Sequence, residues 1–170
     1  MKIGILSDSH DNLNNINKAM IEFGKFKIDL LVHLGDYVSP FSLENLIKES
    51  PTKNIIGIFG NNDGDKIYLK KIANNFNILL DEQPIILDID NMKFLFLHGF
   101  GTKETTLNIV EALSKSKKFN AVVYGHVHEA RLDYINSVLL LNPGEVAGIF
   151  NKPSIAVIES RSLNAKIINI

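Results

Sequence analysis

Two of the chain's five histidines, His126 and His128, lie one residue apart in a Gly-His-Val-His segment. They follow the apolar run 121–124, whose length and β-branched residues predict a buried strand. Alternate residues of an extended chain face the same side, so two imidazoles spaced in this way can converge on a metal ion. The chain contains no cysteine, so a metal site here must use nitrogen and oxygen ligands.

Potential metal ligands also follow four other apolar runs. In open parallel sheets, ligands bind beyond the carboxyl ends of the strands, because loops and helix N-termini gather there. Taken singly, each motif has an ordinary structural explanation as a helix cap, a turn or a buried histidine. Their coincidence favours one metal site at a common edge, where the strand ends carry Asp8 and His10, Asp36, the segment Asn61-Asn62-Asp63, His98, and the pair His126 and His128.

The elements that must position these residues can be read from the pattern. The first two thirds of the chain alternate β-branched runs with amphipathic stretches, which is typical of parallel strands joined by crossover helices. Predicted helices cover residues 13–23, 41–47, 65–76 and 103–116. Predicted strands cover residues 2–7, 29–34, 54–59, 85–90, 92–97, 121–124, 131–134, 138–141, 155–159 and 166–170. The pattern indicates an α/β (α+β) fold closed by an antiparallel β region, with two sheets packed face to face and helices outside.

Composition narrows the classes of partner. A length of 170 residues fits a single domain over residues 1–170. Eighteen basic and nineteen acidic residues, without a long block of one sign, give no strong nucleic-acid signal. No apolar run approaches about 18 residues, so we expect a soluble, cytoplasmic protein without a membrane partner. The edge of the strand-rich C-terminal part leaves a homo-oligomer possible. His33, inside a predicted strand, is expected to be a core or supporting residue rather than a ligand.

In chain order, the motifs D-x-H, G-D, G-N-x-D, H-G and G-H-x-H resemble those of the calcineurin-like metallophosphoesterase superfamily. Chain length, the Gly-Asn-Asn-Asp form and the later Asn142-Pro-Gly144 are most similar to its small YfcE-type phosphodiesterases. The resemblance implies a two-layer β sandwich flanked by helices, with two divalent metal ions. It implies that Asp8, His10 and His128 hold one ion, that Asn61, His98 and His126 hold the other, and that Asp36 bridges both. The resemblance implies that the bound metal is Mn²⁺. Imidazole ligands also suit Ni²⁺, Co²⁺, Fe²⁺ or Zn²⁺.

The implied activity is hydrolysis of a small-molecule phosphodiester by metal-activated hydroxide at a dinuclear site, with Asp36 and Asn61 as candidate catalytic residues. Many members of the superfamily carry histidine where this chain has Asn62, and asparagine cannot serve as a general acid. We therefore expect a preference for phosphodiesters with good leaving groups. The alternatives are a phosphomonoesterase or a non-catalytic interaction scaffold, as in the retromer subunit with this fold, but the complete ligand set favours an enzyme.

Three features near the candidate ligands each have two possible interpretations. Asp63 could orient a ligand or favour a helix N-terminus, and the second interpretation is preferred. Asn12 could lie near the site or only cap a helix. The Asn142-Pro-Gly144 segment could form a turn beside the metals or an ordinary connection.

Overall fold

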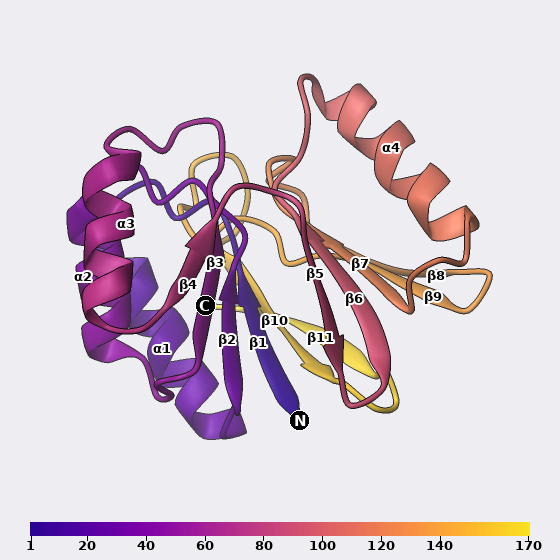
Figure 1. Cartoon of the computed structure of the whole chain (residues 1–170), viewed down its shortest axis with the longest axis horizontal. Helices are drawn as coiled ribbons and strands as arrows, with labels where there is room; N and C mark the ends of the chain where they lie inside the picture. Colours follow the sequence, from indigo (N-terminus) through magenta and orange to yellow (C-terminus); the bar gives the residue numbers. More distant parts are fainter.

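The computed structural model describes residues 1–170 as two β-sheets packed face to face, with helices on both outer surfaces (Figure 1). The first sheet has the order β11-β10-β1-β2-β3-β4. Its strands are β1 (Lys2–Leu6), β2 (Leu30–His33), β3 (Ile55–Ile58), β4 (Leu79–Asp81), β10 (Ser154–Glu159) and β11 (Ala165–Asn169). The second sheet has the order β5-β6-β7-β9-β8. Its strands are β5 (Ile85–Ile89), β6 (Met92–Leu97), β7 (Ala121–Tyr124), β8 (Arg131–Ile135) and β9 (Val138–Asn142). The predicted sandwich is confirmed.

Four helices cover the sandwich. The helices α1 (Leu13–Phe26), α2 (Pro40–Glu49) and α3 (Lys66–Asn75) lie on the first sheet, and α4 (Lys103–Lys115) lies on the second (Figure 1). The expected helix cap at Asp65 is present, because its side chain accepts a hydrogen bond from the Tyr68 amide. None of the four helices combines the length and the apolar character needed to span a lipid bilayer.

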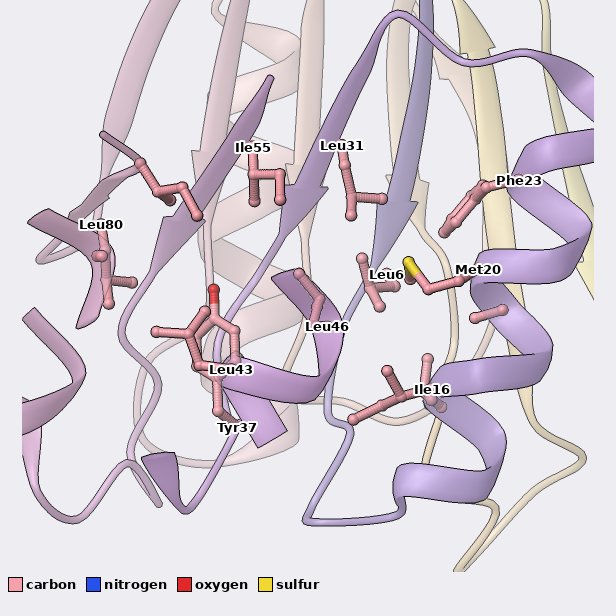
Figure 2. Packing of buried hydrophobic residues seen from close by; sticks show 14 of the residues in the cluster. Leu6, Ile16, Met20, Phe23, Leu31, Tyr37, Leu43, Leu46, Ile55 and Leu80 are labelled. Atoms are coloured by element: carbon pink, nitrogen blue, oxygen red, sulfur yellow. The ribbon is translucent and has the colours of Figure 1, made fainter. Parts of the chain in front are cut away.

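Three apolar layers hold the elements together. Side chains such as Leu6, Met20 and Leu31 fill the space between α1–α3 and the first sheet (Figure 2). Ile5 and Phe96 belong to the layer between the two sheets, and a smaller cluster lies between the second sheet and α4. Because β1 is buried on both faces, its sequence reads as a nearly continuous apolar run.

Strand pairing differs from the expectation in two respects. The strands β7 and β9 pair in parallel, and β6 pairs in parallel with β7, so the region after residue 121 is not wholly antiparallel. The strand β10 instead returns to the first sheet and pairs antiparallel with β1. The short strand β4, absent from the predicted elements, extends the parallel part of that sheet.

These pairings bring the carboxyl ends of β1, β2, β3, β6 and β7 to one rim of the sandwich, where their loops meet (Figure 1). The Asp8 amide donates to the Gly35 carbonyl at 3.1 Å within the first sheet's rim. The His98 ring spans the two sheets, with its Nδ1 2.7 Å from the Leu34 carbonyl oxygen. The predicted ligands therefore come from both sheets.

Candidate metal centre

The rim loops hold their polar residues in left-handed backbone conformations. Non-glycine residues rarely adopt positive φ, and each such residue costs about 1 to 3 kcal/mol unless its surroundings enforce it. Five of the seven predicted ligands do so: Asp8, His10, Asp36, His126 and His128, with φ of 52°, 40°, 59°, 66° and 63°. The expectation that His126 and His128 lie on extended backbone is therefore wrong. The chain turns sharply after β7, and strain of this kind concentrates at functional sites.

A first group of potential ligands consists of Asp8, His10 and His128, whose ligand atoms all lie within 4.8 Å of one another. His128 Nε2 is 3.5 Å from Asp8 Oδ1, and the rings of His10 and His128 have centroids 5.2 Å apart. Burial raises the pKa of Asp8, because the charged carboxylate has lost its hydration without gaining enough compensating contacts. A cation placed between these groups would provide the missing compensation.

A second group consists of Asp8, Asp36 and His98. Asp8 is common to both groups. Asp36, a member of the second, also faces the first, with Oδ2 3.5 Å from His10 Nε2 and Oδ1 3.5 Å from His98 Nε2. Although burial alone would raise the pKa of Asp36, hydrogen bonding and charge from His98 and hydrogen bonds from Asn62 hold it well below the usual range. One oxygen faces each group, which is the arrangement that a bridging carboxylate requires.

His98 has one nitrogen aimed into the site. Its Nδ1 faces the Leu34 carbonyl, so this nitrogen carries a proton and Nε2 is the atom available to a metal. Asn61 Oδ1 lies 2.9 Å from that Nε2. Burial alone would lower the pKa of His98, but Asp36 and Asp8 raise it above the ordinary value. The two carboxylates thus favour a positive charge at His98 Nε2, which a proton supplies in the absence of a metal ion.

His126 lies beside the second group but outside both sets of three. Its ring centroid is 5.1 Å from that of His98, and its Nε2 is 2.8 Å from the Gly101 carbonyl oxygen. A carbonyl accepts only from a protonated nitrogen, so Nδ1 is the ring atom left to bind a metal. The His126 amide also donates to Asp8 Oδ2 at 3.0 Å, which fixes that carboxylate.

The residues present fit a metal site. Asp8 Oδ1 and His10 Nε2 are buried without any hydrogen-bond partner, an arrangement that native proteins avoid unless another group satisfies the atoms. The nitrogen and oxygen donors suit divalent transition metals. Glycine permits the crowding, since a Cβ at Gly60 would lie 2.6 Å from the Asp36 amide nitrogen and 2.8 Å from His98 Cε1.

Asp63 supports the site, and the preferred interpretation of it as a helix N-terminal residue is wrong. Its carboxylate is buried and accepts the amides of Asp36 at 3.1 Å, Val38 at 2.9 Å and Gly60 at 2.7 Å. These bonds join the loops after β2 and β3. Asp63 therefore fixes the backbone that carries Asp36, one of the predicted ligands.

We predict that Asp63→Asn lowers the free energy of unfolding by about 2 to 4 kcal/mol, because an amide NH₂ would face buried donors. Urea unfolding in the presence of a chelator measures this change without a contribution from bound metal. Asp88→Asn, on the exposed part of β5, is the matched control. Equal stability of the two variants would contradict the supporting role of Asp63.

His33 lies outside the cluster, as expected for a supporting residue. It is fully buried, stacks on Tyr37 and accepts the Gly35 amide at Nδ1. Its Nε2 must then donate to Ser9 Oγ, 3.0 Å away. Burial lowers the pKa of His33 to about 3, so it is a neutral link between the loops after β1 and β2.

Other polar residues near the rim have structural partners. Asn12 caps α1 through the Asn15 amide and also donates to the Ala147 carbonyl, so its capping role is present. Asn142 donates to the Gly125 carbonyl and so places its turn beside the His126 loop. Asn62 donates both its amide and its side chain to Asp36, at 2.8 and 2.7 Å.

Glu145 was missed by the sequence reasoning. It is fully buried and lies 3.0 Å from His128 Nδ1. Burial alone would raise the pKa of Glu145, but hydrogen bonds from His128 and three loop amides hold it below the ordinary value. The only signal in the sequence is an isolated carboxylate between an Asn-Pro-Gly turn and the apolar residues Val146 and Ala147.

A helix-flanked β sandwich with carboxylate and imidazole side chains converging at its rim is an arrangement that could hold a divalent metal ion. The model of the calcineurin-like phosphoesterase superfamily domain matches residues 1–162, and the chain belongs to this superfamily.

Individual relatives agree with this assignment. The chain is 38% identical over 164 residues to phosphodiesterase MJ0936 of Methanocaldococcus jannaschii, covering 94% of this chain and 93% of the relative. A solved structure of a novel archaeal phosphodiesterase matches all of both chains with a TM-score of 0.88 and 34% identity. The phosphoesterase YfcE from E. coli also matches over all of both chains, with a TM-score of 0.68 and 18% identity, which shows a shared fold.

Proposed function

We propose that this chain is a phosphodiesterase that depends on two divalent metal ions, most favourably Mn²⁺. The observation that carries the proposal is the convergence of buried carboxylates and imidazoles, with unpartnered atoms on Asp8 and His10. The likeness to a phosphodiesterase across nearly the whole chain supports the choice of reaction. Because the site takes residues from both sheets, we also propose that residues 1–170 act as one domain.

Each candidate residue has a part in this proposal. Asp8, His10 and His128 would hold one ion, and Asn61, His98 and His126 the other, with Asp36 contacting both. The ions would supply Lewis acidity and a water of lowered pKa for attack on phosphorus. Asn61 contributes a neutral oxygen, which limits the negative charge that an approaching phosphate meets. The Gly101 and Leu34 carbonyls hold the rings of His126 and His98 in place.

We predict that the chain hydrolyses aryl phosphodiesters faster than alkyl phosphomonoesters. The Asn62 side chain is turned toward Asp36 and cannot protonate a leaving oxygen. General acids contribute about 100- to 10,000-fold, and an aryl leaving group needs this help least. Values of kcat/KM for both substrates, with Mn²⁺ present, measure the preference.

The control substrates are an aryl monoester and an alkyl diester, which separate the effect of the leaving group from that of the phosphate charge. The matched variant is Asn62→His, which is expected to accelerate cleavage of alkyl esters more than that of aryl esters. Faster turnover of the alkyl monoester than of the aryl diester by the unaltered chain would refute the proposed preference.

A further inference from the structure

Glu145 is a buried charge in the loop between β9 and β10, directly before the apolar residues Val146 and Ala147. It follows the turn after β9 and is fully inaccessible to solvent. A buried carboxylate is strongly destabilising unless paired and hydrogen-bonded, so its partners show what it does.

Four N–H groups surround this carboxylate. Oε2 accepts from His128 Nδ1 at 3.0 Å and from the Ile149 amide at 3.1 Å. Oε1 accepts from the amides of Phe150 and Asn151 at 2.7 and 2.6 Å. With two donors on each oxygen, all acceptor positions of the carboxylate are filled.

This contact determines which nitrogen of His128 faces the candidate centre. A carboxylate can only accept, so Nδ1 of His128 must carry the proton. The other nitrogen, Nε2, faces Asp8 Oδ1 at 3.5 Å and belongs to the first ligand group. Without Glu145, neither the ring orientation nor the tautomer would be fixed from this side.

The same carboxylate fastens the neighbouring loop. Asn151 Nδ2 donates to the His128 carbonyl at 3.1 Å. The Phe150 ring lies edge-on to the His128 ring, with centroids 5.2 Å apart, although 74% of Phe150 is exposed. A loop with an exposed aromatic ring is thus tied to a predicted metal ligand through Glu145 and the Asn151 side chain.

We propose that Glu145 is a positioning residue of the metal centre, which holds His128 with Nε2 toward the ion and fixes the 149–151 loop beside it. This inference rests on the proposed metal dependence, but not on the choice of phosphodiester as substrate. Carboxylates that orient a ligating histidine typically change metal affinity by about 10- to 100-fold when they are replaced.

The test is a calorimetric titration of the chelated full-length chain with Mn²⁺, comparing Glu145→Gln with the unaltered protein. We expect about a 10- to 100-fold weaker affinity for one ion in the variant. Glu159→Gln is the matched control, because it makes the same change at the exposed end of β10. It should bind Mn²⁺ with unaltered affinity.

A purely structural role for Glu145 would lower the melting temperature of the chelated protein and leave Mn²⁺ affinity unchanged, and that result would overturn the inference. If Glu145→Gln does not fold, long-range ¹H–¹⁵N NMR of the unaltered protein with Zn²⁺ decides the matter. A proton on Nδ1 of His128 with metal at Nε2 supports the inference, and the reverse pattern overturns it.

These outcomes are separable from failure of the proposed function. Glu145-dependent Mn²⁺ binding without any phosphodiester hydrolysis would reject the proposed reaction and retain this inference. Full hydrolysis with Mn²⁺ affinity independent of Glu145 would retain the reaction and reject this inference.

Discussion

Dialysis against a chelator is expected to abolish hydrolysis of an aryl phosphodiester by this chain, and added Mn²⁺ is expected to restore it. The reason lies in the buried rim, where Asp8 Oδ1 and His10 Nε2 have no hydrogen-bond partner and Asp36 faces imidazoles on both sides. No side chain near these atoms replaces the charge that a divalent ion would supply to a phosphate under attack.

The same treatment is expected to lower thermal stability. A ligand that binds only the folded state at 100 times its dissociation constant stabilises that state by about 2.7 kcal/mol. For a chain of this size, that energy corresponds to a change in melting temperature of about 5 to 10 °C. Calorimetric melting with and without chelator measures the change, and elemental analysis of the same samples gives the number of ions per chain.

The variant His128→Ala provides the control for this experiment. It removes one member of the first ligand group, so its melting temperature should respond much less to the chelator than that of the unaltered protein. Undiminished hydrolysis in samples without detectable metal would contradict the proposed metal dependence. An identical chelator response in both proteins would instead place the stabilising ion away from His128.

Local patterns made most of the fold predictable. The apolar spacing that indicated a helix from residue 13 corresponds to the buried face of α1, and the strand predicted at residues 2–7 corresponds to β1 (Lys2–Leu6). The strand β4 was missed because its three residues are too few to show periodicity. The pairing of Lys2 with Glu159 was also beyond reach, since it depends on packing between distant segments rather than on either sequence alone.

The part of the candidate site that lies just after predicted strands could be predicted from the sequence. Asp8, Asp36 and His98 each come within two residues after an apolar run, and the sheets bring them together. Asp63 and Glu145 were not assigned correctly because most of their partners are backbone amides, which have no sequence signature. The left-handed backbone at His126 and His128 was missed because an apolar strand before a motif does not show where the chain turns.

The substitution Asp36→Asn is expected to reduce kcat/KM for the aryl diester by about 1000-fold. Asp36 is the carboxylate that faces both His10 and His98 at 3.5 Å, and asparagine removes its charge while keeping nearly the same volume. A metal centre contributes several kcal/mol to transition-state stabilisation, and each 1.36 kcal/mol corresponds to a tenfold change in rate. Steady-state kinetics with saturating Mn²⁺ measures the loss.

Two further readouts separate a bridging role from general damage. The amide NH₂ of the variant would face the donors of Asn62, so some loss of stability is expected, and circular dichroism must show that the protein remains folded. If Asp36 bridges, metal content should fall by one ion or more per chain, since both proposed ions would lose a ligand. Asp88→Asn removes the same charge from an exposed position and should retain metal content and activity. A neutral amide oxygen cannot replace a carboxylate that is shared by two cations. Retention of full turnover by Asp36→Asn would therefore show that Asp36 does not bridge two ions.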